Sequence, residues 1–429
     1  MSALEREVAS SADRTGHVAP TAEPTPPPPA ATGRLSVEGK LLRRLLSFIG
    51  NPPIEFVLWT GERVSASGAP AVARVQLRDR ATLLGLVKDP HISFGDLYSE
   101  GRVTIDGDLV QFIEAMYHAA PVQPKAVRTL GSILRGAHRL RRNTLTGSRE
   151  NIHHHYDIGN EFYSLWLGST MAYTCAYYPR PDATLDEAQI AKFDHVCRKV
   201  QLRAGESVVE AGFGWGGLAL HMARHYGVKV RAFNISHEQV MYARERAARE
   251  GLSSQVEYVE DDYRNISGRY DAFVSVGMLE HVGVENYPTL GGVAHKVLGS
   301  NGRGLIHSIG RNRPAPLHPW ITKRIFPGAY PPSIAEFMQI FEPWDFSVLD
   351  IENLRLHYAR TLTHWLELYD KSAERVRAMF DAKFERMWRL YLAGSIAGFT
   401  QGSLQLFQVV FAPRGNNNVP MTRAHLYAS

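Results

Sequence analysis

The 429-residue sequence predicts an α/β protein with a doubly wound parallel sheet covered by helices on both faces, preceded by a smaller α+β domain. The sheet is indicated by short β-rich runs that alternate with amphipathic runs from Asn151 onward. A glycine-rich loop directly after the first of these β-rich runs indicates the same fold. Hydrophobic residues make up 44% of the chain, which is enough for a sizeable core.

Composition also limits where the protein works and what it contacts. No apolar run approaches the ~20 residues of a membrane-spanning helix, and the start of the chain lacks the apolar stretch of a signal peptide. The only two cysteines, Cys175 and Cys197, exclude a disulfide framework and fit a reducing cytoplasm. The net charge of +5 favours an anionic partner, either a lipid surface or nucleic acid.

The chain divides into four segments. Residues 1–33 are rich in Pro, Ala and Thr and lack hydrophobic periodicity, which predicts a disordered tail. Residues 34–120 predict an accessory α+β domain, with helical runs KLLRRLLSFIG and DLVQFIEAMYHAA around strand-like runs IEFVLWTG and AVARVQL. Residues 121–150 form a basic linker, and residues 151–429 carry the alternating pattern.

The basic linker has two interpretations. Between residues 121 and 149 there is no acid, and the basic residues are Lys125, Arg128, Arg135, Arg139, Arg141, Arg142 and Arg149. It could be a solvated linker helix, or a patch for anionic headgroups, where each basic residue contributes about 1 kcal/mol. Nucleic acid is disfavoured as the partner because no aromatic residues lie between the arginines to stack on bases.

The elements of the sheet follow in chain order. The β-rich runs are SVVEAG (207–212), KVRAFNI (229–235), QVEYVED (255–261), YDAFVSVG (270–277) and RGLIHSI (303–309). The helical runs between them are LALHMARHY (218–226), HEQVMYARERAARE (237–250) and YPTLGGVAHKVL (287–298). Two late runs, FSVLDIENL (346–354) and LQLFQVVFAP (404–413), could complete the sheet, with residues 362–399 helical between them.

The loop VVEAGFGWGG (208–217) is the first candidate ligand site. Gly212, Gly214 and Gly216 let the backbone turn sharply and approach a ligand closely. The glycines also match the dinucleotide fingerprint, so their spacing alone leaves the ligand open.

Two neighbouring residues favour S-adenosylmethionine over a nicotinamide dinucleotide. Glu210 lies two residues before the first glycine, where a carboxylate can meet the cationic amino-acid end of a sulfonium ligand but would repel a pyrophosphate. The second β-rich run ends in Asn234, where an NAD site usually has an acid that binds the ribose. An NAD-dependent oxidoreductase is therefore a disfavoured alternative.

Two further pairs continue this site. Ser236 and Gln239 match a capping box that would start the next helix. Asp262 and Tyr263 follow the third β-rich run, where they are expected to meet the edge and face of an adenine.

The run VSVGMLEHVG ends abruptly in Glu280 and His281. The pair could be a solvated strand end, or it could form the floor of an active site, because ligands bind at the carboxyl edge of an open α/β sheet. His307 ends the next β-rich run; alone it would be read as a core histidine, but beside Glu280 on an adjacent strand it favours an active site. If Glu280 and His281 are both extended, their side chains point to opposite faces, so His281 is interpreted as a packing or cofactor-side residue.

Several stretches, in this order, resemble the cyclopropane-fatty-acid synthase family of S-adenosylmethionine-dependent methyltransferases, which includes the mycolic-acid cyclopropane synthases. The resemblance runs from about Asn151 to Pro413. The stretches are HYDIGNEFYSLWLG (155–168), MAYTCAYY (171–178), EAGFGWGG (210–217), VSVGMLEHVG (274–283), WITKRIFPGAYPPS (320–333), HYARTLTHW (357–365), WRLYLAG (388–394) and LFQVVF (406–411). A smaller domain before the catalytic one is similar to the bacterial phospholipid-acting members.

The resemblance implies a class I methyltransferase-type fold for a catalytic domain over 151–429 and a lipid-binding or dimer-forming role for residues 34–120. It implies methyl transfer from S-adenosylmethionine to a cis double bond in an acyl chain of a membrane phospholipid, then proton loss and ring closure. The expected partners are that phospholipid and an anionic membrane surface, but no nucleic acid, and a homodimer with a second copy is one option. The expected location is cytoplasmic, peripheral to the inner membrane face.

The resemblance also implies site residues. For the cofactor they are Tyr173, Thr174, Glu210, Gly212, Gly214, Gly216, Asn234, Ile235, Gln239, Asp262 and Tyr263. The base that removes the proton is implied to be a bound bicarbonate, held by Cys175, Glu280, His307, Ile309 and Tyr358. Taken alone, Cys175 could be a small buried hydrophobe, and the reaction offers no acyl group for it to attack. Aromatic faces can stabilise the carbocation, and the candidates, any of which could be ordinary core, are Phe162, Tyr163, Tyr173, Tyr177, Tyr178 and Trp365.

No metal is expected. His153, His154 and His155 are adjacent, cannot all face one ion, and lack a Cys or acid to complete a tetrahedral set. The family's usual GCGWGG loop has Phe213 here, which is expected to alter packing under the cofactor. Ser395 and Thr400 also depart from the family pattern, which puts in doubt any role carried over to that late region and could signal a different lipid preference.

Two alternatives remain besides the oxidoreductase. The same fold and cofactor could give a methylene- or methyl-branched acyl chain by loss of a different proton. A non-catalytic lipid-binding protein could keep the fold without activity, but the complete set Cys175, Glu280, His307 and Tyr358 argues against it.

Overall fold

The computed structural model describes residues 34–119 and 158–427. The predicted disordered tail, the basic linker and the three adjacent histidines lie outside the described residues. The boundaries predicted at 120 and 151 lie outside them too. In the described part, two separate sheets are present.

The smaller sheet has the strand order β2-β1-β3-β4. Its strands are β1 (Ile54–Val57), β2 (Arg63–Val64), β3 (Ala73–Leu77) and β4 (Val103–Gly107), and its helices are α1 (Val37–Phe48), α2 (Arg80–Lys88), α3 (Pro90–Ser99) and α4 (Leu109–Ala119). The predicted helical and strand-like runs of this region are confirmed as α1, β1, β3 and α4. Only β3 pairs in parallel with β1, while β2 and β4 are antiparallel to their neighbours.

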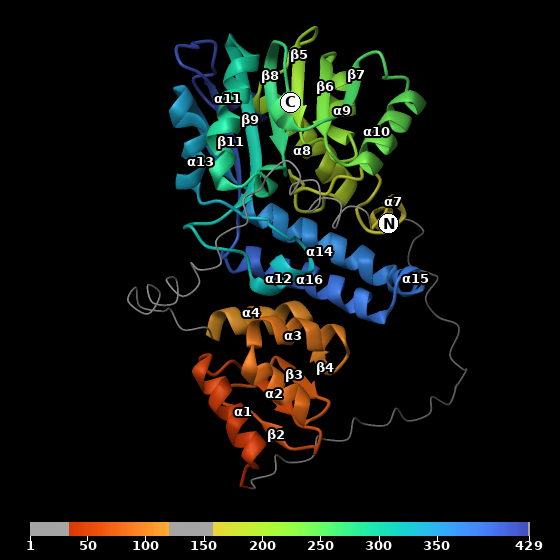
Figure 1. Cartoon of the computed structure of the whole chain (residues 1–429), viewed down its shortest axis with the longest axis vertical. Helices are drawn as coiled ribbons and strands as arrows, with labels where there is room; N and C mark the ends of the chain where they lie inside the picture. The colour runs from red at the N-terminus through yellow and green to blue at the C-terminus, as the bar shows by residue number, and fades with distance from the viewer. Residues whose placement is uncertain (1–33, 120–157, 428–429) are drawn as a thin grey trace, which may run out of the picture. The chain divides into compact units, whose positions relative to one another are not determined.

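The larger sheet has seven strands in the order β10-β11-β9-β8-β5-β6-β7 (Figure 1). The strands are β5 (Ser207–Ala211), β6 (Lys229–Asn234), β7 (Val256–Glu260), β8 (Tyr270–Val276), β9 (Leu298–Gly310), β10 (Phe346–Asn353) and β11 (Gln405–Pro413). All seven predicted runs are confirmed as strands. Five of them are parallel, as the alternating pattern predicts, and the two late runs complete the sheet, with β11 antiparallel to β9 and to β10.

Helices cover both faces of this sheet, as predicted. One face packs against α8 (Leu185–Lys199), α9 (Gly217–Tyr226) and α10 (His237–Arg249), and the other against α11 (Tyr287–Val297) and α13 (Ile334–Phe341). Adjacent residues of β5 show the alternation, because Val208 lies in the first core and Val209 in the second. The run over 362–399 is helical as expected, within α14 (Arg355–Lys371), α15 (Ala373–Met379) and α16 (Ala382–Thr400).

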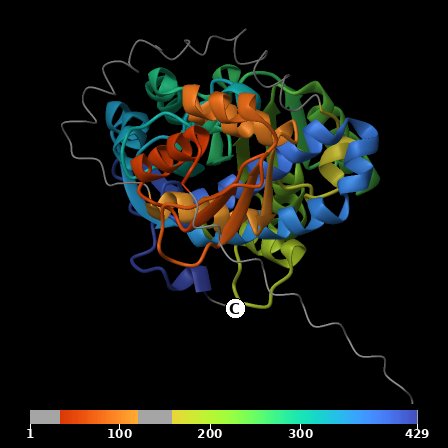
Figure 2. The same cartoon turned by 90° about the horizontal axis from the view of Figure 1, so that it is seen from below.

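The helices α14 and α16 pack on each other, and α16 also contacts α3 and α4 (Figures 1 and 2). One continuous apolar core contains residues of the small sheet, of α14 and α16, and of the segment 162–178. Trp388 of α16 and Trp365 of α14 are almost fully buried within it. Within residues 34–119 and 158–427, no helix combines the length and apolar composition needed to cross a bilayer.

Local sequence explains several helix starts. Thr184 and Glu187 form a capping box at α8, and Ser333 and Glu336 form another at α13. The capping box predicted at Ser236 is wrong, because the Ser236 side chain makes no cap hydrogen bond at the start of α10. The Gln239 side chain instead accepts a hydrogen bond from Asn234, at 2.8 Å.

Candidate active site

A cavity of about 110 Å³ lies at the carboxyl ends of β5, β6 and β8, where ligands bind in open α/β sheets. It is lined by Met171, Ala172, Tyr173, Thr174, Lys192, Phe193, Glu210, Gly212, Phe213, Gly214, Trp215, Gly217, Leu218, Asn234, Gln239, Val276, Gly277, Met278 and His281. A second cavity of about 60 Å³ is lined by Gly212, Phe233, Asn234, Ile235, Asp261, Asp262, Tyr263, Arg264, Met278, His281 and Val282. The two share Gly212, Asn234, Met278 and His281, so they are adjoining compartments.

The glycine loop turns as its sequence predicts. Gly212, Gly214 and Gly216 have φ of 84°, 55° and 80°, a region that other residues rarely adopt. A Cβ on Gly212 would lie 2.7 Å from Cβ of Met278, and one on Gly216 would lie 2.5 Å from the Tyr258 hydroxyl. Gly212 and Gly214 line the larger cavity, whereas Gly216 starts α9 and is buried against Tyr258.

Glu210 lies near the end of β5 and lines the larger cavity. It is buried, and burial raises the pKa of its carboxyl to about 8 although the Lys192 charge opposes this rise. Among the described residues, Glu210 Oε2 has no hydrogen-bond partner. A buried carboxylate with an unused acceptor suits the ammonium group of an amino-acid ligand, so the residues present fit S-adenosylmethionine.

Asn234 lies between the two cavities. Its side-chain amide donates to Gln239 Oε1 at 2.8 Å and to the Gly214 carbonyl at 3.3 Å, which ties β6 to the glycine loop. Gln239 lines the larger cavity and Ile235 the smaller one. All three therefore lie at the site that the sequence predicts.

Asp262 and Tyr263 line the smaller cavity, as expected for the adenine end. Asp262 accepts from the Arg264 backbone at 2.9 Å and from the Arg264 guanidinium at 2.7 Å. Because its carboxylate is paired in this way, Asp262 holds the turn after β7 in place as well as lining the cavity.

Tyr173 and Thr174 approach the larger cavity from the segment before α8. The hydroxyl of Tyr173 lies 2.9 Å from that of Tyr391. Thr174 Oγ1 accepts a hydrogen bond of 2.8 Å from the Lys192 ammonium.

The sequence interpretation missed Lys192 and Met278, which line the larger cavity. A signal for Lys192 was present, because the helical period places it on the same face of α8 as Leu185, Ala188 and Val196, which are buried. Met278 lies in the short loop after β8, where no periodicity marks it. His281 lines both cavities, which agrees with a cofactor-side position, and burial lowers its pKa to about 4.

Glu280 lies four residues beyond the end of β8, in the 3-10 helix η2 (Leu279–His281). The expectation that it ends the strand is therefore wrong, and η2 turns its carboxylate toward β9. Glu280 Oε1 accepts from the Ile309 backbone N–H at 2.6 Å, so this donor is already engaged by the carboxylate. Oε2 is buried without a hydrogen-bond partner in the described part of the chain, and burial raises the Glu280 pKa to about 7.

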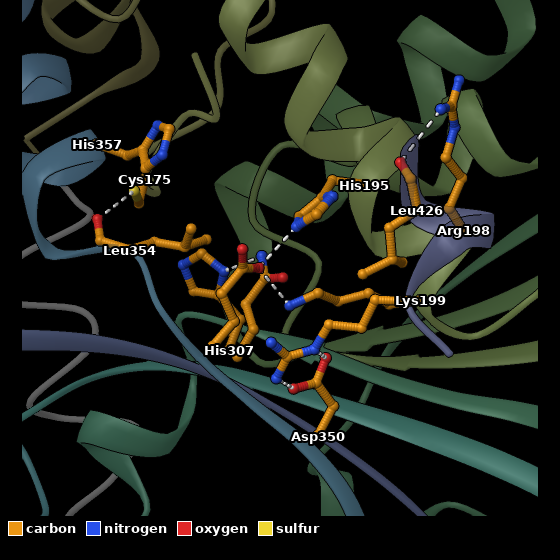
Figure 3. Close-up of polar contacts among 12 residues, drawn as sticks. Cys175, His195, Arg198, Lys199, His307, Asp350, Leu354, His357 and Leu426 are labelled. Atoms are coloured by element: carbon orange, nitrogen blue, oxygen red, sulfur yellow. Dashed lines mark hydrogen bonds and ion pairs between the residues drawn. The ribbon is translucent and has the colours of Figure 1, made fainter. Parts of the chain in front are cut away.

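His307 lies within β9, three residues before its end, and is not at the strand terminus. It is directly opposite Gln408 of β11, whose Nε2 lies 3.0 Å from His307 Nδ1 (Figure 3). Burial lowers the His307 pKa well below its usual value, so the ring is neutral. An amide nitrogen can only donate, so Nδ1 accepts and the proton lies on Nε2.

Cys175 and Tyr358 approach from other elements. Cys175 is fully buried, and its Sγ donates to the Ala176 carbonyl at 3.1 Å and lies 3.9 Å from the Leu354 carbonyl (Figure 3). Burial raises the pKa of this thiol, so it stays protonated. The Tyr358 backbone N–H donates to the Leu354 carbonyl, the same carbonyl that lies near Cys175 Sγ. Leu354 is therefore a shared neighbour of Cys175 and Tyr358.

The two parts of the site follow each other along the chain. Tyr173 and Thr174 line the larger cavity and Cys175 comes next, while Gly277 and Met278 line it three and two residues before Glu280. The Gly277 backbone also donates to the His307 carbonyl at 2.9 Å. A ligand in the larger cavity therefore lies against the same segments that carry Cys175 and Glu280.

The six aromatic candidates do not form one group. Phe162, Tyr163, Tyr173 and Trp365 lie in a network of ring contacts with Trp166 and Trp388. Tyr177 instead stacks between His195 and His357, at centroid distances of 4.1 and 4.8 Å, and Tyr178 lies near His364. His195 and Lys199 in turn bind Glu352, at 2.7 and 2.6 Å, in a buried ion network that the sequence interpretation did not foresee (Figure 3).

Comparison with known proteins identifies the family. The profile described as "Mycolic acid cyclopropane synthetase" matches residues 143–409. The "Probable fatty acid methyltransferase" of Pseudomonas putida is 35% identical over 397 residues, 87% of this chain and 96% of that protein. The chain belongs to this family. It is an S-adenosylmethionine-dependent methyltransferase, so the oxidoreductase and non-catalytic alternatives are set aside.

Two further relatives are similar over about three fifths of the chain. The "Cyclopropane-fatty-acyl-phospholipid synthase" of Escherichia coli (strain K12) is 38% identical over 270 residues, 63% of this chain and 69% of that protein. The crystal structure of mycolic acid cyclopropane synthase CmaA1 complexed with SAH and CTAB matches with a TM-score of 0.59 at 28% identity. That match covers 62% of this chain and 98% of the other, and it confirms the predicted class I methyltransferase-type fold.

Proposed function

We propose that this enzyme transfers a methylene unit from S-adenosylmethionine to the cis double bond of an unsaturated acyl chain in a membrane phospholipid, forming a cyclopropane ring. The observation that carries the proposal is the buried carboxyl of Glu280, whose Oε2 has no hydrogen-bond partner among the described residues and which lies two residues after Met278 in the wall of the cofactor cavity. S-adenosylmethionine supplies the electrophilic one-carbon unit. An alkene needs no deprotonation before it attacks, so the protein's main task at this step is alignment in a dry pocket.

The aromatic network around Tyr173 and Trp365 is suited to the next stage. Addition of the one-carbon unit leaves a carbocation on the acyl chain, and ring faces stabilise a cation by its attraction to the π system. Tyr163 and Trp166 pack against Tyr173, with centroids 5.5 and 5.2 Å away. These contacts hold the Tyr173 ring at the cavity wall and exclude water that would trap the cation.

Removal of the last proton needs a base, and two of the predicted residues offer the acceptor and the donor that a bound bicarbonate would need. Bicarbonate, when bound, supplies a base that does not itself trap the cation. Glu280 Oε2 is an unfilled buried acceptor that can take the hydrogen of such an anion, and the Nε2–H of His307 is a donor for its oxygen. With its pKa near 7, Glu280 can accept and release a proton at neutral pH.

Substitution of Glu280 tests this function. Glu280→Gln keeps the size of the side chain and its acceptor for Ile309, so we expect normal folding and cofactor binding. Product formation should fall by at least 100-fold, measured by mass spectrometry of phospholipids after incubation with unsaturated vesicles. Glu342→Gln, at an exposed site, is the control. Near-normal turnover of Glu280→Gln would remove this carboxylate from the mechanism.

The alternative product is a methylene- or methyl-branched chain. The Pseudomonas putida relative is named a probable fatty acid methyltransferase, which supports this alternative. Ring and methylene branch both add the mass of one CH₂ to the lipid. Mild hydrogenation then adds hydrogen to a methylene branch but leaves the ring, and a methyl branch carries two more hydrogens from the start. We expect the masses of the ring product. The masses of either branched chain would identify that chain as the product in place of the ring.

The substrate also suggests where the enzyme works. We propose that it acts from the cytoplasm at the inner membrane face, held there by an anionic lipid surface, and that it can form a homodimer through residues 34–120. The net charge of +5 supports the attraction to anionic lipid. Cell fractionation and light scattering test these points.

A further inference from the structure

Lys192 is a buried cation in the wall of the cofactor cavity. It lies on α8, is 1% exposed, and lines the larger cavity together with Glu210. Among the described residues its ammonium group donates one hydrogen bond, to Thr174 Oγ1 at 2.8 Å, and it lies 4.3 Å from the centre of the Phe193 ring. An ammonium group has three hydrogens to donate, so one bond to a neutral hydroxyl leaves most of its capacity unused.

A charge buried in this way normally has a hydrogen-bonded counterion. Lys192 and Glu210 influence each other's charge, yet Glu210 Oε2 has no hydrogen-bond partner among the described residues. Burial lowers the pKa of Lys192 to about 7 and raises that of Glu210 to about 8. Burial thus disfavours the charged form of each group, and a ligand charge of the opposite sign would stabilise that form.

We propose that Lys192 binds the α-carboxylate of the amino-acid end of S-adenosylmethionine, while Glu210 accepts from its α-ammonium. A zwitterion needs one partner of each sign, and the cavity offers one of each. The adjoining smaller cavity, lined by Asp262 and Tyr263, remains for the adenosine end. The proposal concerns cofactor binding only, so it holds or fails independently of which lipid product is made.

Thr174 takes part by fixing the direction of the Lys192 side chain. The hydrogen bond between them joins α8 to the segment that also carries Tyr173 and Cys175. Binding of the carboxylate at Lys192 therefore holds in place the segment of Tyr173, Thr174 and Cys175. Lys192 acts through cofactor position and does not touch the acyl chain.

Two probes separate the two ends of the cofactor. S-adenosylhomocysteine carries the amino-acid end, and 5′-methylthioadenosine has the same thioether and adenosine without it. In Lys192→Met, which keeps the length and apolar volume of the stem, calorimetry should show a loss of roughly 10- to 100-fold in affinity for S-adenosylhomocysteine, typical of one charged hydrogen bond. Affinity for 5′-methylthioadenosine should be unchanged, which also shows that the variant is folded. An equal loss for both probes, or no loss for either, would overturn the proposal.

The pH dependence of binding gives a second readout. In Lys192→Met only Glu210 titrates, so S-adenosylhomocysteine should bind more tightly as pH rises and the carboxylate forms. In Glu210→Gln only Lys192 titrates, so binding should weaken as pH rises and the ammonium is lost. The other titratable groups near the pair are Cys175, Cys197, Tyr258, His281 and His307, and burial shifts the pKa of each so that its neutral form is favoured. Slopes of the same sign in both variants would contradict the assignment.

Discussion

Glu280 and Glu210 are buried acids in a folded protein, and both act against its stability at neutral pH. Burial raises their pKa values to about 7 and about 8, above the value of 4.5 that an exposed glutamate has. A group with a raised folded-state pKa stabilises the fold fully only below its unfolded pKa, and this stabilisation is lost as pH rises through the folded value. At neutral pH the unfolded state therefore gains free energy by ionising these two carboxyls, and the rest of the fold must offset that gain.

This argument predicts how Glu280→Gln changes the pH dependence of unfolding. Between pH 5 and pH 7.5, wild type should lose on the order of 2 kcal/mol that the neutral glutamine does not lose. The thermal unfolding midpoint of the variant, relative to wild type, should therefore be higher at pH 7.5 than at pH 5. Glu342→Gln should show no such change, and an identical difference at both pH values for Glu280→Gln would mean that the carboxyl is not desolvated.

At the residue scale, the two cavities lie at the sheet edge where sequence reasoning predicts a ligand site. Glu210, Asn234 and Asp262 could be predicted because each follows or ends a recognisable strand, and the carboxyl edge of a parallel sheet gathers such residues. The helical period places Lys192 on the buried face of its helix, but a lysine is rarely fully buried, so residue type argues against the position that the period indicates. The partnership of His307 with Gln408 depends on the pairing of β9 with β11, two strands separated by about a hundred residues of chain.

At the element scale, the loop after β8 governs both halves of the site. Gly277 has φ of 77°, and a Cβ there would lie 2.7 Å from Cγ2 of Thr174. Thr174 accepts a hydrogen bond from Lys192 of α8 and packs against Gly277 of the loop, so Thr174 links the loop to α8. A glycine at 277 therefore keeps Thr174 in place.

Gly277→Ala tests this coupling. The substitution adds left-handed backbone strain of about 1 kcal/mol and a steric clash that typically adds 1–3 kcal/mol. We expect a lower thermal unfolding midpoint and weaker binding of S-adenosylhomocysteine. The matched control is Gly251→Ala, where φ is 70° and no atom lies within 4 Å of the added carbon. If both variants lose equal stability and keep full affinity, the clash with Thr174 is absent.

The elements themselves were largely predictable, but their directions were not. Hydrophobic runs and glycine turns revealed all seven strands of the large sheet, yet nothing in the sequence of β11 states whether it runs parallel or antiparallel to β9. The direction follows from α14, α15 and α16, which return the chain to the sheet from the opposite end. Likewise, Gln239 was read as a cap because the spacing fits, whereas the nearby Asn234 amide competes for it.

At the scale of the whole molecule, the apolar core that joins the small sheet to α14 and α16 is continuous. Contacts such as that of Trp320 Nε1 with Asp96, at 3.1 Å, and of Arg324 with the same carboxylate, at 2.8 Å, join α3 to α12 (Pro319–Arg324). The sequence predicted two regions of different architecture. It did not predict this shared core, because helices with apolar residues on several faces do not reveal which partner covers each face.

The basic segment predicts a measurable membrane interaction of the whole chain. Replacing the arginines between 125 and 142 with glutamine should weaken binding to anionic vesicles, by about 1 kcal/mol for each residue that approaches the surface. Because the attraction is electrostatic, added salt should weaken wild-type binding toward that of the variant. Sedimentation with phosphatidylglycerol vesicles measures the effect, and neutral phosphatidylcholine vesicles are the control. Unchanged binding to the anionic vesicles would leave the segment a simple connection.

Because Cys175 and Cys197 are buried, their labelling rates report how often the folded chain opens. Both thiols are free and buried, and burial raises their pKa values, so in the folded state neither presents the thiolate that alkylating reagents attack. Labelling by iodoacetamide can then proceed only when the chain opens, and its rate at each cysteine counts those openings. Cys175 directly follows Thr174 of the cavity wall, whereas Cys197 lies on the buried face of α8, in the core between that helix and the sheet. S-adenosylhomocysteine should therefore slow the labelling of Cys175 more than that of Cys197, and equal slowing would mean that both thiols are reached only by global unfolding.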